Sequence, residues 1–213
     1  MPDFRIRKME LKDKNALMEI LHLADPHGEG HPAPELVYRR WGEYYFEESR
    51  DHCFVAAHRA TDRAAGVILC APDTPGYQKI FNKHYYREIQ KTLDQVENSH
   101  PGTIRKHHMA YYRKREGVQL NLVHFRSMRH IYREYPAHLH INIHPDCQRL
   151  GLGHLLVDAL LNPLKETGIK GLHLIVASDN SKGIGFYRKY GFKELLNIFP
   201  RGKNGIIYGL KTS

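Results

Sequence analysis

The chain has 213 residues, which is enough for one α/β domain with a single buried core and a sizeable insertion. Hydrophobic residues make up 41% of the sequence and charged residues 26%, and the mean hydropathy is −0.56, which excludes a disordered chain and a membrane-spanning one. Lys and Arg exceed Asp and Glu by nine, which favours partners that carry phosphate or other negative charge.

The cysteines and one histidine pair indicate whether the chain binds a metal and in which redox compartment it lies. Cys53, Cys70 and Cys147 are an odd number without CxxC spacing, which predicts neither a disulfide framework nor a cysteine zinc site and favours the reducing cytoplasm. His27 and His31 flank Gly28-Glu29-Gly30 and could begin a metal site, but the sequence supplies no third ligand. We therefore expect no metal and interpret this segment as a flexible loop.

The first third of the chain predicts alternating helices and strands. A strand is expected at 4–9, and helices are expected at about 13–23 and 34–48, the second of which begins at a proline. Two short apolar runs, 53–57 and 66–70, flank a polar turn and predict a β-hairpin.

Residues 72–136 differ in composition from the rest of the chain. Between 76 and 136 there are twelve Lys or Arg against five Asp or Glu, so most of the net charge lies here. Helical spacing is visible at 77–96 and again around 109–132. We predict a helical insertion whose aromatic residues line a substrate pocket. A nucleic-acid surface is the less favoured alternative.

Strand and helix patterns alternate again after the insertion. Pro163 should weaken the last turn of one helix, and Gly168 is expected to cap it. The expected elements are a strand at 137–143, a helix from 152 to about 164, a strand at 172–177, a helix at about 181–190, and strands near 192–198 and 205–210. The whole chain, 1–213, is thus predicted to be a single α/β domain. Its mixed central sheet has six to seven strands flanked by helices, with the insertion between the third and fourth strands.

A glycine-containing loop joins the 137–143 strand to the next helix. Its sequence, from His144 to Gly153, is HPDCQRLGLG. The first amides of a helix have no intrahelical acceptor, and the macrodipole places a partial positive charge there, so glycines that let an anion approach create a phosphate site.

A second motif follows the next strand and, together with the loop, carries a family resemblance. Asn180 is followed by Gly183, Phe186-Tyr187, Lys189 and Gly191-Phe192. The two motifs resemble those of the GNAT superfamily of acetyl-CoA-dependent N-acetyltransferases, namely Q/R-x-x-G-x-G/A and N-x-x-A/G-x-x-F-Y-x-K-x-G-F. The resemblance covers most of the chain apart from the insertion, and it implies a GNAT fold with acetyl-CoA as cosubstrate.

The resemblance also implies roles for particular residues. The backbone of Ile141 and Ile143 would pair with the pantetheine arm, and Asn180 would hydrogen-bond the same region. Tyr187 would protonate the departing CoA thiolate, which suits a phenol because its ordinary pKa is about 10. The main-chain amides of the loop would hold the pyrophosphate, which assigns Gln148, Arg149, Leu150, Gly151, Leu152, Gly153 and His154 to cofactor binding.

The general base is less well defined by the sequence. His138, His140, Asn142 and His144 alternate along one strand, so they share one face. Some family members use a histidine pair on this strand, but the matching positions here are Ala137 and Leu139, one residue out of register. His140 is a candidate base if a bulge restores the register, and otherwise these histidines are structural.

A narrower resemblance rests on Tyr135-Pro136-Ala137-His138-Leu139-His140-Ile141-Asn142-Ile143-His144-Pro145 and on Ala71-Pro72-Asp73-Thr74. These strings look like the acetyltransferase-like domain attached to some O-GlcNAcases and its free-standing relatives. That group often has Asp where this chain has Asn142. Asparagine cannot accept a proton as a base, although it can orient a water or the acceptor.

Two functions follow as hypotheses. The leading one is transfer of an acetyl group to a primary amine of a small molecule or peptide, and the basic insertion favours an acidic or neutral amine. The alternative is a catalytically silent acyl-CoA-binding module with a regulatory or interaction role. Neither a membrane nor a nucleic acid is the expected partner, and the oligomeric state is left open.

Overall fold

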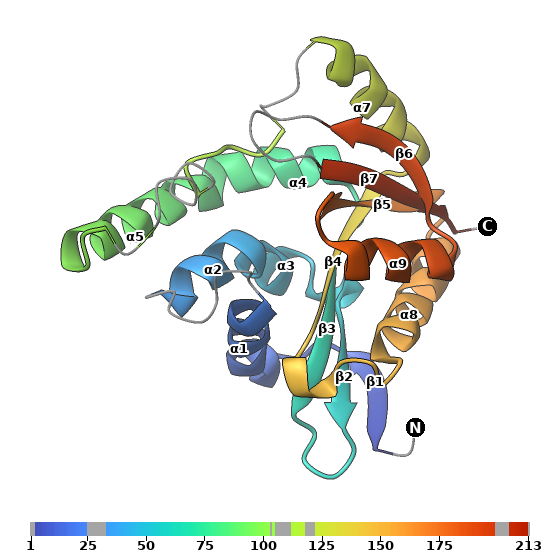
Figure 1. Cartoon of the computed structure of the whole chain (residues 1–213), viewed down its shortest axis with the longest axis horizontal. Coiled ribbons are helices and arrows are strands. Elements are labelled where there is room, and N and C mark those ends of the chain that lie inside the picture. The colour runs from blue at the N-terminus through green and yellow to red at the C-terminus, as the bar shows by residue number, and fades with distance from the viewer. Residues whose placement is uncertain are drawn as a thin grey trace.

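The structure is a computed structural model that describes residues 3–24, 33–102, 104, 112–117, 122–198 and 205–212. Within these residues, seven strands form one mixed sheet in the order β1-β2-β3-β4-β5-β7-β6 (Figure 1). The strands are β1 (Phe4–Lys8), β2 (Phe54–His58), β3 (Ala64–Ala71), β4 (Ala137–Ile143), β5 (Gly171–Ala177), β6 (Lys193–Ile198) and β7 (Gly205–Lys211). The predicted α/β fold with a mixed sheet of six to seven strands is confirmed.

The pairing of the strands places one parallel pair at the centre of the sheet. β4 and β5 are parallel, and all other neighbouring strands are antiparallel. A parallel pair needs a crossover, which α8 (Leu152–Glu166) provides. The loop between β4 and α8 therefore lies at the carboxyl end of the central pair.

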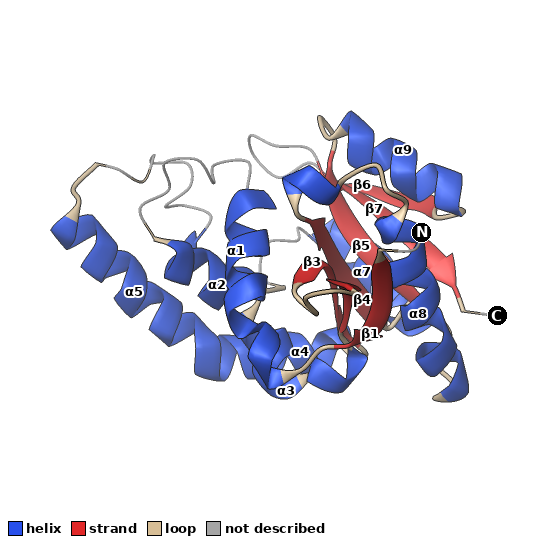
Figure 2. Ribbon diagram, turned by 90° about the horizontal axis from the view of Figure 1, so that it is seen from below, coloured by secondary structure: helices blue, strands red, loops and turns tan. Residues whose placement is uncertain are grey.

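Helices cover both faces of this sheet (Figures 1 and 2). One face carries α1 (Lys14–Ala24), α2 (Pro34–Trp41), α3 (Glu43–Glu48), α4 (Thr74–Ile80) and α5 (Tyr86–Ser99). The opposite face carries α8 and α9 (Ser181–Tyr190). None of the helices in the described residues is long and apolar enough to cross a membrane. Ala137 and Leu139 of β4 belong to the apolar cluster under α8 and α9, whereas the rings of His138 and His140 meet that of Tyr45 on the opposite face.

The helix expected at 34–48 is two helices, because the chain breaks at Gly42. Gly42 has φ −122° and ψ −39°, and it separates α2 from α3. A Cβ atom at this position would lie 2.6 Å from Leu21 Cδ1 and 2.9 Å from Tyr38 Cδ2. The close approach of α1 therefore requires glycine here, and periodicity alone could not reveal that contact.

The insertion lies between β3 and β4, as predicted, and its described part is helical. The stretch expected at 77–96 comprises α4, a π-helical turn at Phe81–Tyr85 and α5. The stretch expected around 109–132 contains α7 (Leu122–Glu134), whereas Met109 lies outside the described residues. Both the amide and the hydroxyl of Thr74 donate to the carbonyl of Pro136, at 2.9 and 2.7 Å. These bonds hold the two ends of the insertion together.

The remaining boundaries differ little from the predictions. α8 continues through Pro163 to Glu166 instead of weakening before it, and short 3-10 turns lie at Leu11–Asp13, Arg50–His52 and Pro145–Cys147. Gly168 has φ +73° and donates to the carbonyl of Lys165, so it ends α8 as expected.

Candidate functional site

The two central parallel strands separate toward their carboxyl ends. β4 pairs with β5 only at Ala137 with Leu172 and at His138 with His173. Beyond His138, β4 stays paired with β3 and β5 stays paired with β7. From Leu139 to Ile143 the edge of β4 that faces β5 therefore has no strand partner in the described sheet. An open edge of this kind presents backbone donors and acceptors to a ligand.

A tight turn between Gln148 and Gly151 adjoins the open end of β4. Arg149 has φ +63° and Gly151 has φ +74°, so two backbone units of the turn are left-handed. Gly151 is the N-cap of α8 and supplies no side-chain acceptor to the first helical amides. The amides of Leu152 and Gly153 donate to no described group and can bind an anion, whereas the His154 amide donates to the Gly151 carbonyl at 3.1 Å. The left-handed units make the concave backbone shape that anions favour. Residues Gln148 to His154 thus form this turn and the first residues of α8, and their assignment to cofactor binding stays a prediction.

The side chain of Phe186 covers the start of α8. A Cβ atom on Gly153 would lie 3.0 Å from Cε2 and Cζ of Phe186 and 3.8 Å from Cδ1 of Ile141. The rings of Phe186 and His154 meet edge to face at 5.1 Å. The helix start, α9 and β4 therefore converge at Gly153, where only a hydrogen atom fits. These contacts make Phe186 a packing residue.

Asn180 begins α9 beside the open end of β5. Its Oδ1 accepts a hydrogen bond from the amide of Gly183 at 2.9 Å, which is an N-cap bond. The cap uses one side-chain oxygen and leaves the amide group of this exposed residue able to donate to a ligand. The structure thus gives Asn180 a local structural role that sequence reasoning missed.

Tyr187 lies on α9 among aromatic neighbours. Its ring centroid is 5.2 Å from that of Phe186, 5.4 Å from that of Phe192 and 6.4 Å from that of Tyr208. Its hydroxyl makes no hydrogen bond with any described residue. Burial raises the pKa of Tyr187 well above its ordinary value, so the phenol keeps its proton at neutral pH.

His138 is held in a chain of buried hydrogen bonds on the opposite face of the sheet. The hydroxyl of Thr74 donates to Pro136, so it accepts from Nδ1 of His138 at 2.8 Å. Nε2 of His138 therefore carries the lone pair and accepts from the Tyr45 hydroxyl at 2.7 Å. Both ring nitrogens are occupied, and burial holds the pKa of His138 well below its ordinary value. His138 is accordingly a structural residue.

His140 lies next to His138 along the same face of β4, but its ring nitrogens are not engaged in the same way. β4 pairs with β3 from His138 to Ile143 without a register shift, so the bulge that would restore the family register is absent from this ladder. The His140 ring is 5.4 Å from Trp41 and 5.5 Å from Tyr45, and its nitrogens bond to no described residue. Burial lowers the pKa of His140 to about 4, so the ring is neutral at pH 7 and is a weak base that can accept a hydrogen bond. Asn142, half-buried, continues this face.

Two groups near His140 were missed by the sequence analysis. Glu116 forms an ion pair with the buried guanidinium of Arg40, and its negative charge acts on His140 against the effect of burial. The signal that could have found it is that Glu116 is the only acidic residue between Glu97 and Glu134. His173 on β5 donates from Nδ1 to the carbonyl of Tyr135 at 2.7 Å, and burial lowers its pKa to about 4.

Metal binding finds no support in the described part of the chain. No group of three or more His, Cys, Asp or Glu residues there could hold an ion. The segment His27–His31 lies outside the described residues, as do His107 and His108.

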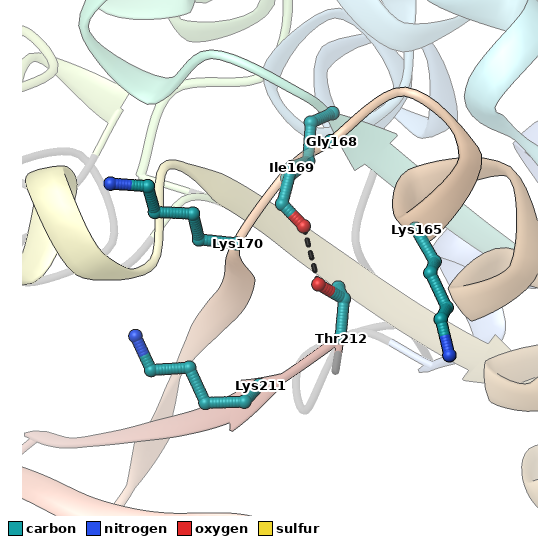
Figure 3. Close-up of a pocket in the computed structure, with 6 residues that line it drawn as sticks. All are labelled: Lys165, Gly168, Ile169, Lys170, Lys211 and Thr212. Atoms are coloured by element: carbon teal, nitrogen blue, oxygen red, sulfur yellow. Dashed lines mark hydrogen bonds between the residues drawn. The ribbon is translucent and has the colours of Figure 1, made fainter.

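A solvent-open hollow of about 450 Å³ lies at the other end of α8 from the Gln148–Gly151 turn (Figure 3). Its lining residues are Lys165, Gly168, Ile169, Lys170, Lys211 and Thr212. The Lys211 ammonium is 3.0 Å from a Glu134 carboxylate oxygen and 4.5 Å from the ring centroid of Tyr135, and the Thr212 hydroxyl donates to the Ile169 carbonyl. This hollow is separate from the candidate site.

The separated parallel strands, the glycine turn and the two flanking helices define a GNAT-type α/β transferase fold. The family described as the acetyltransferase (GNAT) family matches residues 78–192, which is more than half of the chain. The chain therefore belongs to the GNAT acetyltransferase family. GNAT acetyltransferases use acetyl-CoA, which confirms the predicted cosubstrate.

Curated relatives match this chain over short stretches. The ribosomal protein bS18-alanine N-acetyltransferase of Salmonella typhimurium is 38% identical over 79 residues, which cover 34% of this chain and 53% of that protein. The mycothiol acetyltransferase of Actinosynnema mirum is 44% identical over 52 residues, which cover 24% of this chain and 18% of that protein. The matched stretch thus spans about half or less of these relatives.

Solved structures match over the whole chain. The crystal structure of SsHAT has a TM-score of 0.71 at 22% identity, and the match covers 100% of this chain and 100% of that one. The structure of yncA from Salmonella typhimurium with its cofactor acetyl-CoA has a TM-score of 0.58 at 14% identity, and the match covers 99% of this chain and 95% of that one. At these identities the likeness concerns the fold.

Proposed function

We propose that this protein is an N-acetyltransferase that moves an acetyl group from acetyl-CoA to a primary amine. The observation that carries the proposal is the unpaired edge of β4 beside the left-handed turn at the start of α8. Backbone groups of Ile141 and Ile143 would pair with the pantetheine arm, and the amides from Gln148 to His154 would hold the pyrophosphate. Asn180 would donate its side-chain amide to the pantetheine region.

In the proposed reaction, the amine loses its proton to solvent through water, because a pKa of about 4 makes the His140 ring too weak a base to hold that proton. The neutral, half-buried ring of His140 instead accepts a hydrogen bond from the amine and orients it. The lone pair of the amine nitrogen then forms the C–N bond at the thioester carbonyl. Collapse of the tetrahedral intermediate breaks the C–S bond. Tyr187 donates its proton to the thiolate and regains one from the new amide nitrogen through water. Burial that raises the pKa of the phenol also makes the thiolate more basic, which keeps this transfer feasible. Asn142 would orient the acceptor or a water, because an amide cannot act as the base.

The narrower resemblance to the acetyltransferase-like domain of the O-GlcNAcase type also belongs to this proposal. Its support is that Thr74 and His138, which lie in the two strings that carry it, form one buried hydrogen-bond chain. We propose this group as the nearest relatives, with residues 1–213 forming one unit and the cytoplasm as the location. Three free cysteines are compatible with a reducing compartment.

Substitution of Tyr187 tests the catalytic assignment. Tyr187→Phe should lower kcat by about 10²-fold or more and leave the Kd for acetyl-CoA unchanged, because only the proton is lost. Tyr190→Phe is a matched control from the same helix, since the Tyr190 hydroxyl donates to Asp158 on the protein surface. Equal rates for the Tyr187 variant and the natural protein would remove Tyr187 from the role of acid.

The silent acyl-CoA-binding module makes a different prediction. Both functions predict stabilisation by acetyl-CoA, by about 2.7 kcal/mol at a concentration 100 times the Kd. Only the enzyme releases free thiol in the presence of an amine panel. Tight acetyl-CoA binding without thiol release from any amine class would favour the module, and no binding at millimolar acetyl-CoA would refute both.

A further inference from the structure

The region around His140 contains a carboxylate that the insertion brings to the sheet. Glu116 belongs to the described segment 112–117, which is far in sequence from both α2 and β4. Its backbone is fixed by Asn82, whose Nδ2 donates to the Glu116 carbonyl and whose Oδ1 accepts from the Glu116 amide, both at 2.9 Å. A pair of reciprocal bonds of this kind fixes where the side chain begins.

The side chain of Glu116 is fixed as well. Its Oε1 pairs with a guanidinium nitrogen of Arg40, whose side chain is only 5% exposed. The Arg40 guanidinium carbon lies 4.9 Å from the ring centroid of Trp41 and 5.0 Å from that of Phe81. A buried arginine packed against two rings cannot rotate freely, so it holds the carboxylate in one position.

The second carboxylate oxygen is available to a ligand. No hydrogen bond of Glu116 Oε2 with a described residue is present, and the side chain remains 23% exposed. Trp41, which contacts Arg40, is also 5.4 Å from the His140 ring, so one continuous set of contacts runs from Glu116 to β4. The Glu116 charge acts on His140, Tyr45 and Tyr132, and the paired Arg40 guanidinium acts on His140 in the opposite sense.

We propose that Glu116 is the acceptor-binding group, and that the acceptor is a primary amine that arrives as an ammonium ion. This inference rests on the proposed function and specifies its substrate class. A fixed carboxylate with one unengaged oxygen, aromatic rings and a neutral imidazole beside it form a site that favours a cation over a neutral molecule of the same shape. The amines favoured are aliphatic, because arylamines are neutral at pH 7 and gain nothing from the charge. The net charge of the insertion favoured an acidic or neutral amine, whereas the unengaged carboxylate oxygen of Glu116 favours a cation.

The single tryptophan of the chain provides a direct measurement. Trp41 lies between Arg40 and His140, so its fluorescence reports on ligands at this site without requiring turnover. The titration uses 2-phenylethylamine, which is an ammonium ion at pH 7, and 2-phenylethanol, its neutral analogue, in the presence of CoA, which has no acetyl group to transfer. The proteins are the natural chain, Glu116→Gln and the matched control Glu88→Gln, which removes an exposed carboxylate from α5.

The expected result is saturable binding of the amine to the natural chain and to Glu88→Gln, with at least tenfold weaker binding to Glu116→Gln. The alcohol should bind weakly and equally to all three. Raising the salt from about 0.05 to about 0.5 M should weaken amine binding to the natural chain and leave alcohol binding unchanged, which tests the charge without a substitution.

Equal amine affinities of the natural chain and Glu116→Gln, equal affinities of the amine and the alcohol, or no saturable amine binding would each overturn the proposal. A melting curve shows whether Glu116→Gln is folded, and the salt series keeps the test valid if it is not. Failure of acetyl-CoA to stabilise the protein would instead refute the proposed function, because that measurement does not involve Glu116.

Discussion

Replacement of Tyr45 by phenylalanine removes one hydroxyl group from the buried hydrogen-bond chain on β4. The side chain of Tyr45 is 1% exposed and that of His138 is 8% exposed, so water cannot replace the lost donor. The lone pair of His138 Nε2 would remain unpaired, which costs about 1–3 kcal/mol for a buried polar atom. A loss of about 2 kcal/mol corresponds to a melting temperature roughly 4–8 °C lower in a chain of this size.

Tyr44→Phe is the matched control for this measurement. Tyr44 is the preceding residue, is also buried, and its hydroxyl makes no hydrogen bond with a described residue. We expect this variant to change the free energy of unfolding by less than about 0.5 kcal/mol. Urea unfolding at pH 7.5 measures both variants against the natural chain, with the m-value as a check that the unfolded states are comparable. If Tyr45→Phe were as stable as Tyr44→Phe, the inferred chain from Tyr45 to Thr74 would be wrong.

Further predictions concern pH and two glycines. Burial lowers the pKa of His173 to about 4 and that of His138 well below its ordinary value, so the unfolded chain binds more protons below pH 6.5 than the folded chain does. Their contribution to stability is complete above pH 6.5 and is lost as the pH falls, by about 2 kcal/mol per histidine at pH 5. Urea unfolding at pH 7.5, 6 and 5 checks this, and equal stability at all three would contradict it. Gly151→Ala should destabilise the protein by about 1 kcal/mol, because the φ angle of Gly151 is +74°. The same substitution should weaken acetyl-CoA binding in calorimetry, and an unchanged Kd would count against the turn as a phosphate site. Gly185→Ala should stabilise α9 by about 0.5–1 kcal/mol in thermal unfolding, because the added Cβ meets no atom within 4 Å, and a lower melting temperature would show that the helix is packed more tightly there.

Local patterns in the sequence predicted most of the elements, because they depend on residues that are close together in the chain. Strict alternation gave the bounds of β4, and apolar spacing after Asn180 gave those of α9. The glycine turn before α8 was predictable for the same reason, since the left-handed φ of Gly151 is a local property. The helix expected at 34–48 was wrong at Gly42 because the cause is contact with α1, which no local pattern records.

The site was only partly predictable. The sequence indicated which residues could meet a cofactor, but the separation of β4 from β5 depends on each strand's other neighbour in the sheet. The sequence named His140 as a candidate base and placed His138 on the same face without a role of its own. The structure distinguishes them, because Tyr45 and Thr74 occupy both nitrogens of His138 and leave those of His140 open.

The sequence by itself determined the α/β architecture, the family resemblance and the turn that begins α8, because periodicity, glycines and helix ends act over a few residues. Only the tertiary structure decided which side chains share one environment. Tyr45 and His138, which share a hydrogen bond, are 93 positions apart. Arg40, which precedes β3 in the sequence, forms an ion pair with Glu116, which follows β3. Such contacts depend on how the helices pack on the sheet. A titratable group acquires its shifted pKa, and a buried hydrogen bond its structural role, only after that packing has excluded water.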